Sequence, residues 1–94
     1  MTFLSLWVDQ VKAAENSGDL FVAYDLATQG LAEHPDSIDL RYLATRSLAR
    51  SGATDQAATA YAKFGLGQSD NGDVAALGAR IAKDQALAAS AWRA

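Results

Sequence analysis

The sequence predicts an all-α protein in which five helices fold as a single domain over residues 1–94. Alanine, the residue with the highest helix propensity, supplies 21 of the 94 residues, whereas proline occurs once. Apolar residues recur every three or four positions within segments that short polar turns separate. Matching residues also recur at a longer, fixed interval. Together these observations indicate short helices packed in succession.

The longer interval is 34 positions, and it relates the first part of the chain to the rest. Identical pairs include Ser17 and Ser51, Gly18 and Gly52, Ala23 and Ala57, Asp39 and Asp73, Leu43 and Leu77, and Arg46 and Arg80. A repeat of this length is expected when each helical unit buries its apolar face against the next unit. Proteins of this kind usually present a binding surface rather than perform a reaction.

The first predicted helix covers residues 2–16 and ends at a glycine turn. Gly18 suits the left-handed conformation that follows a helix, and Asp19 can cap the helix that comes next. The second helix extends to about residue 33, where His34 and Pro35 end it, because a residue before proline avoids helical geometry. The first helix carries a wide apolar stripe of Phe3, Leu4, Leu6, Trp7 and Val11, and the second is expected to bury Leu20, Ala23, Tyr24, Ala27 and Leu31.

The third helix is predicted to start at a capping box formed by Asp36 and Asp39 and to end at Arg50. Thr54 is expected to cap a fourth helix that extends to about Leu66, and a polar loop follows it over residues 68–72. Asp73 is expected to cap a last helix of up to 20 residues. The third helix is expected to bury Leu40, Leu43, Ala44 and Leu48, and the fourth carries Ala57, Ala58, Tyr61 and Phe64. The last helix has Val74, Leu77, Ile81, Ala88 and Trp92 on one side, and its end, from Leu87 to Trp92, is expected to extend beyond the second hairpin.

These residues resemble the tetratricopeptide repeat (TPR), a helix-turn-helix unit of 34 residues. The matching positions are Trp7, Gly18, Ala23 and Pro35 in the first unit and Gly52, Ala57 and Tyr61 in the second. The departures are Gln10-Val11 and Ala44-Thr45 in place of Leu-Gly, Ala27 in place of the aromatic residue, and Ser69 in place of the second proline. More weakly, the chain resembles helical N-terminal segments of some bacterial multidomain proteins, which implies either a piece of a larger protein or a stand-alone relative.

The resemblance implies antiparallel hairpins stacked as a short right-handed superhelix. Repeat 1 would cover about residues 4–35, repeat 2 about 38–69, and a long C-terminal capping helix about 73–92. In this family the first helix of each unit lines a concave groove. The groove positions carried over are Ser5, Val8, Lys12 and Glu15, then Asp39, Tyr42, Arg46 and Arg50, then Asp73, Ala76, Arg80 and Lys83.

One groove position is basic in all three units: Lys12, Arg46 and Arg80, here named the basic row. Packed helices would place its members about 10 Å apart. The predicted function is therefore protein–protein interaction, in which the groove binds an acidic or C-terminal peptide. The candidate binding residues are Lys12, Tyr42, Arg46, Arg50, Arg80 and Lys83.

Two alternatives to this interpretation stay open. In the first, the basic row is an ordinary solvated face that Asp9, Glu15 and Asp84 partly neutralise. In the second, the chain is a self-assembly module that dimerises through the C-terminal helix and Trp92. Chaperone tails are not the expected ligand, because Val8, Lys12 and Leu43 replace the asparagine-containing clamp of chaperone-binding relatives.

Composition excludes several other classes of function. Without cysteine, and with His34 as the only histidine, the chain lacks the ligands of a transition-metal site, and no cofactor is expected. A positioned nucleophile and base are not evident, so the protein is predicted not to be an enzyme. The net charge of −3 argues against nucleic acid. The sequence has neither a basic leader nor a membrane-length apolar run, so a cytoplasmic location is expected.

Overall fold

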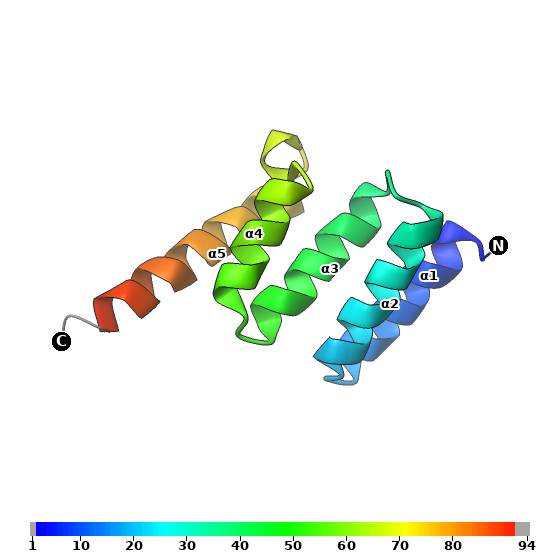
Figure 1. Ribbon diagram of the computed structural model, residues 1–94, viewed down its shortest axis with the longest axis horizontal. Coiled ribbons are helices and arrows are strands. Elements are labelled where there is room, and N and C mark those ends of the chain that lie inside the picture. Colours follow the sequence, from blue (N-terminus) through cyan, green and yellow to red (C-terminus); the bar gives the residue numbers. More distant parts are fainter. Residues whose placement is uncertain (1, 92–94) are drawn as a thin grey trace.

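The computed structural model describes residues 2–91, and within that range the chain forms helices and turns without a β-strand. The elements are α1 (Leu4–Asn16), α2 (Leu20–Glu33), α3 (Ile38–Arg50), α4 (Thr54–Lys63), the short 3-10 helix η1 (Leu66–Gln68) and α5 (Gly72–Ala91). Successive helices lie side by side and alternate in direction (Figure 1). The all-α prediction is confirmed.

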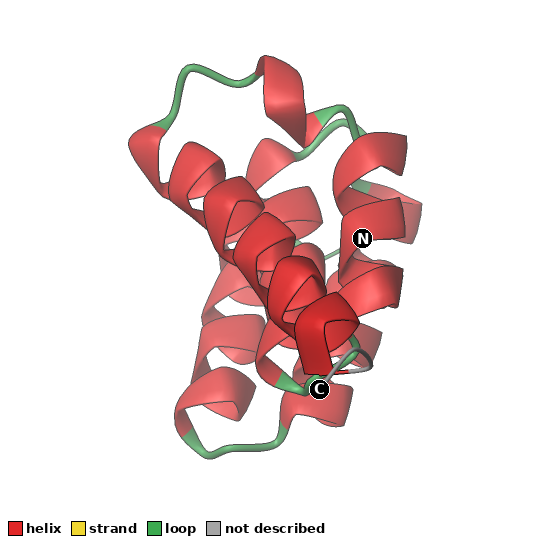
Figure 2. Cartoon of the chain, turned by 90° about the vertical axis from the view of Figure 1, so that its left-hand side faces the viewer, coloured by secondary structure: helices red, strands yellow, loops and turns green. Residues whose placement is uncertain are grey.

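The helices form an elongated stack of 50 × 29 × 20 Å. Besides contacts between neighbours in the chain, α1 contacts α3 and α3 contacts α5, whereas α2 and α4 do not approach each other in the described part of the chain. Helices α1, α3 and α5 therefore form one continuous layer. Figure 2, viewed from the end at which α5 projects, shows α5 crossing the front of the stack. Because directions alternate, α1, α3 and α5 all point the same way.

The turns after α1 and α3 have the same backbone geometry, 34 residues apart. Gly18 has a φ of +81° and Gly52 a φ of +87°, in the left-handed region that side-chain-bearing residues avoid. The backbone N–H after each glycine donates to a carbonyl in the last turn of the preceding helix. These bonds join Asp19 to Ala14 at 2.9 Å and Ala53 to Leu48 at 3.0 Å. The sequence interval thus corresponds to a recurring local structure.

The core consists of two clusters that reflect the same interval. The first contains Val11, Ala23, Ala27, Leu40, Leu43 and Ala44, and the second contains Ala49, Ala57, Leu77 and Ile81. Ala23 and Ala57 are fully buried at equivalent places in α2 and α4. Their small side chains allow neighbouring helices to pack closely. Tyr42 packs against both clusters and so joins them.

Gly30 permits the closest helix contact in the first half of the stack. A Cβ atom at this position would lie 2.8 Å from Leu40 Cδ1 and 3.0 Å from Trp7 Cγ, both too short for ordinary packing. Leu40 is fully buried, so it has little room to move. Because Gly30 has no side chain, Trp7 of α1 and Leu40 of α3 can both pack against this part of α2.

Three of the four predicted helix caps are wrong by one or two residues, and Asp19 occupies the capping position of α2 without a side-chain hydrogen bond. The Ser37 hydroxyl, rather than Asp36, accepts the backbone N–H of Leu40 at 3.2 Å. Asn71 Oδ1 accepts the N–H groups of Asp73 and Val74 at 2.8 and 3.3 Å, so α5 begins one residue before Asp73. Thr54 is the first residue of α4 and follows the capping position. A cap must lie two or three residues before the N–H that it receives, and neighbouring polar residues compete for that place.

Two predicted helix ends are also corrected. The first helix begins at Leu4 rather than at residue 2, because Thr2 is held against the end of α2. Its N–H donates to Glu33 Oε1 at 2.7 Å, and its carbonyl accepts His34 Nε2 at 2.8 Å. The fourth helix ends at Lys63 rather than near Leu66, because Gly65 adopts a φ of +67° and turns the chain into η1.

Only part of the apolar stripe on the first helix is buried. Phe3 is 78% exposed and Leu6 is 49% exposed, whereas Val11 is fully buried. Helix α1 lies at the end of the stack, so its outer side has no helix to cover it. An apolar stripe alone does not show which of its members face the next helix.

Helix α5 packs through its first half and projects beyond the stack in its second (Figure 1). Val74, Leu77 and Ile81 are buried, but Ala88 is exposed and Leu87 is 60% exposed. Leu87 and Ala88 thus belong to the end of α5 that was expected to extend beyond the second hairpin. Trp92 lies outside the described residues, and dimerisation through this helix stays a prediction.

Candidate binding site

Two adjoining hollows lie along the layer formed by α1, α3 and α5. The first, of about 210 Å³, is lined by Val8, Lys12, Ile38, Asp39, Tyr42, Leu43, Arg46, Asn71, Asp73 and Val74. The second, of about 190 Å³, is lined by Tyr42, Arg46, Arg50, Asp73, Ala76, Leu77 and Arg80. Because they share Tyr42, Arg46 and Asp73, they form one continuous surface, here named the α1–α3–α5 groove.

Five of the six candidate binding residues line this groove: Lys12, Tyr42, Arg46, Arg50 and Arg80. Lys83 is exposed on α5 but lines neither hollow. The groove also includes Val8, Asp39, Asp73 and Ala76, which the family pattern placed there. Ser5 does not line it, and Glu15 is buried beneath it rather than displayed.

Arg46, the central member of the basic row, is committed to an ion pair within the protein. Its Nη2 donates to Glu15 Oε1 at 2.6 Å and its Nε donates to Glu15 Oε2 at 3.2 Å, a two-pronged contact between α3 and α1. Glu15 is only 6% exposed. A carboxylate so far from water needs such a partner, because burial of an unpaired charge is strongly unfavourable.

The hydrogen bond to Glu15 raises the pKa of the Arg46 guanidinium above its ordinary value, against the opposing effect of burial. Arg50 lies at 3.7 Å from the same carboxylate, and the Ser47 hydroxyl lies at 3.5 Å. Glu15 therefore holds together α1 and two turns of α3. The basic row is not three equivalent free cations, because its central charge already has a buried partner.

Tyr42 lies at the centre of the groove, where it contacts Arg46 and packs against both core clusters. The Arg46 guanidinium lies 5.1 Å from the centre of the Tyr42 ring, and its Nη1 donates to the Tyr42 hydroxyl at 3.4 Å. Glu15, Arg46 and Tyr42 thus form a chain from the buried interior to the surface. A half-buried aromatic ring held in this way offers apolar area to a ligand without further ordering.

Lys12 and Arg80 provide the accessible positive charge on the two outer helices, whereas on α3 the exposed Arg50 shares the Glu15 carboxylate with Arg46. Lys12 is exposed and forms no ion pair among residues 2–91. Arg80 Nε lies 3.7 Å from Asp84 Oδ2, but both groups face water, so this pair is weak and easily exchanged. The two cations lie on the outer helices of the layer, on either side of Tyr42.

Negative charge gathers at the opposite edge of the groove. Asp39 lies in the first turn of α3 and Asp73 in the first turn of α5, and both are exposed. Neither forms an ion pair within the described range. We name these two residues the acidic row. Both residues were expected in the groove from the sequence, but with helix-capping roles alone, so the pattern of charge was missed.

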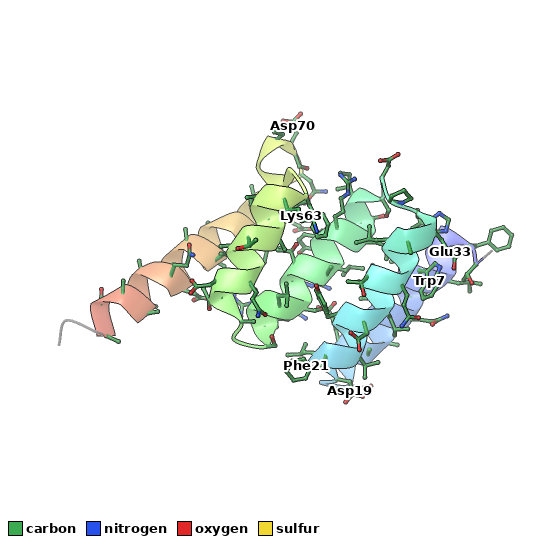
Figure 3. The ribbon with its side chains drawn as sticks, in the orientation of Figure 1. Trp7, Asp19, Phe21, Glu33, Lys63 and Asp70 are labelled. Carbon is green, nitrogen blue, oxygen red and sulfur yellow. The ribbon has the colours of Figure 1, made fainter. Side chains whose placement is uncertain are left out.

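A third hollow, of about 570 Å³, lies on another face of the stack. It is lined by Tyr24, Leu48, Asp55, Gln56, Thr59, Ala60, Lys63 and Phe64. Lys63, one of these lining residues, is labelled on α4 in Figure 3. The hollow lies where α2 and α4 do not meet. It contains none of the candidate binding residues, and its rim carries one acidic and one basic side chain from the same helix.

Comparison of the chain with protein-family models, curated proteins and solved structures finds no match. Within residues 2–91 the structure contains no group of three metal-ligating side chains. None of the described helices combines the length and the apolar character that crossing a membrane requires. The proposed function is therefore based on the geometry of the α1–α3–α5 groove.

Proposed function

We propose that the chain is a short TPR-like repeat protein that binds a segment of another protein in its α1–α3–α5 groove. The observation that carries this proposal is the continuity of the groove across three helices. Five of the six residues selected from the sequence line it. Matching glycine turns 34 residues apart support the TPR-like arrangement.

The groove combines the two features that peptide recognition uses. Its accessible apolar side chains include Tyr42, which lines both hollows, Val8, which lines the first, and Ala76, which lines the second. Charged side chains surround this apolar area, as at the rim of a protein interface. Burial of apolar area would supply affinity, whereas Lys12 and Arg80 would orient the ligand and speed its association. In this proposal the chain acts by binding, without a catalytic step or a cofactor.

Charge reversal at the two accessible cations tests this proposal. A displayed library of random peptides is selected against the wild type and against Lys12→Glu/Arg80→Glu. We expect the variant to bind the selected peptides about tenfold more weakly, because each reversal replaces an attraction with a repulsion. Higher salt should weaken wild-type binding as well.

Lys63→Glu/Lys83→Glu provides the matched control. It changes the net charge by the same amount, but Lys63 and Lys83 lie outside the α1–α3–α5 groove. Circular dichroism establishes that each variant stays helical. Equal weakening by the two double variants would show that overall charge, not the groove, governs binding and would contradict the proposal. Failure of the wild type to enrich any peptide would also contradict it.

A further inference from the structure

We infer that the α1–α3–α5 groove recognises an amphipathic helix of a partner protein that is acidic along one side of its apolar stripe and basic along the other. This inference rests on the proposed function and names the chemistry of the partner. It departs from the sequence-based expectation of a uniformly acidic ligand, because the structure places negative charge in the groove as well as positive charge.

The two charged rows lie on opposite edges of the groove. On α3, Asp39 precedes Arg46 by seven residues, and on α5, Asp73 precedes Arg80 by seven residues. Both helices point the same way, so the acidic row lies at one edge and the basic row at the other. The separation along each helix is about 10 Å, at 1.5 Å per residue.

The strip between the rows is apolar. Tyr42 lies between Asp39 and Arg46 on α3, and the half-buried Val8 on α1 and the exposed Ala76 on α5 extend the same strip. The buried side chains of Leu43 and Val74 close its floor. A strip about 10 Å wide matches the 10–12 Å diameter of an α-helix with its side chains. A partner helix that lies across α1, α3 and α5 would therefore place its apolar stripe on Tyr42 and its flanks against the two rows.

The two charged rows determine which charged residues the partner helix can carry on each side of its apolar stripe. An entirely acidic segment would place carboxylates beside Asp39 and Asp73, where they would be repelled. An entirely basic segment would meet Lys12 and Arg80 with the same result. Arg46 and Arg50 share one carboxylate, that of Glu15, so together they add one net positive charge to the basic side of the groove. A helix with Glu on one flank and Lys on the other satisfies both rows.

Asp39 and Asp73 also stabilise α3 and α5, because a negative charge in the first turn interacts favourably with the helix dipole. The test must separate this role from binding. Asp55 provides the control, because it lies in the first turn of α4 and outside the α1–α3–α5 groove. Asp55→Asn removes a first-turn charge without changing the acidic row.

The experiment uses a displayed library of helical peptides with a constant apolar stripe and with Glu or Lys at each flanking position. We expect the wild type to enrich peptides with Glu on one flank and Lys on the other. The enrichment should be about tenfold over peptides of equal composition in which the two residues are mixed on both flanks. Asp39→Asn/Asp73→Asn should keep the preference for Glu and lose that for Lys, and Asp55→Asn should select as the wild type does.

Enrichment of peptides with Glu on both flanks would overturn this inference, as would an unchanged selection by Asp39→Asn/Asp73→Asn. Binders from the random library together with none from the helical library would also overturn it. Each of these outcomes leaves the groove as a binding site. The absence of binders from both libraries would instead overturn the proposed function itself.

Discussion

Replacement of Glu15 with glutamine should lower the free energy of unfolding by about 2–3 kcal/mol, although it removes only one charge. Glu15 is 6% exposed and receives two hydrogen bonds from Arg46. In the variant, the partly buried guanidinium would face a neutral amide, and one amide N–H would point toward a donor. The loss follows from leaving a charge without its partner rather than from lost volume.

Urea denaturation followed by circular dichroism measures this loss, with Asp84→Asn as the control. Asp84 pairs with Arg80 at 3.7 Å, but that pair faces water and should contribute at most about 0.5 kcal/mol. The raised pKa of Arg46 contributes stability that is lost only as the pH rises through that value, in the strongly alkaline range. The difference between wild type and Glu15→Gln should therefore be constant between about pH 7 and 9. A loss no larger than that of Asp84→Asn would show that the Glu15 contact is not structural.

Replacement of Tyr42 with alanine should reduce affinity for a selected peptide about 30-fold, or about 2 kcal/mol. The Tyr42 ring lines both hollows of the α1–α3–α5 groove and is held beneath the Arg46 guanidinium. Central, preordered aromatic residues supply a large share of the binding energy at interfaces. Isothermal titration calorimetry measures the change, at a temperature where circular dichroism shows the variant to be folded.

Two further variants separate the role of the ring from other effects of Tyr42→Ala. Tyr42→Phe keeps the ring and loses the hydroxyl that accepts from Arg46, and its affinity should stay within about threefold of wild type. Phe21→Ala removes an aromatic ring that is 78% exposed on α2, outside the groove, and should bind normally (Figure 3). Wild-type affinity in Tyr42→Ala would remove this residue from the binding site.

The helices and turns were predictable because their causes are local. Helix propensity, apolar periodicity and a glycine with positive φ act within a few residues, so α1 to α5 could be located from sequence. The exact caps were less predictable, because Asp36 and Ser37 are both competent and only the geometry of the chain selects one. The exposure of Phe3 and Leu6 depends on which helices flank α1, and that information is not local.

Most residues that line the groove were predictable from the sequence, but the ion pairs that they form were not. A spacing of 34 residues places Lys12, Arg46 and Arg80 in register, and the structure brings all three to the groove. The burial of Glu15 depends on Arg46 reaching across from α3, and sequence spacing alone contains no such contact. Gly30 was missed for the same reason, because its neighbours Trp7 and Leu40 come from two other helices.

The location of the bound peptide tests the central claim most directly. A peptide selected by the wild type is added to ¹⁵N-labelled protein, and the backbone amide shifts are compared with those of the free protein. We expect the largest changes along the α1–α3–α5 groove, at Lys12, Tyr42 and Asp73. Changes centred instead on the third hollow, at Tyr24, Thr59 and Lys63, would contradict the account and place the binding surface on another face.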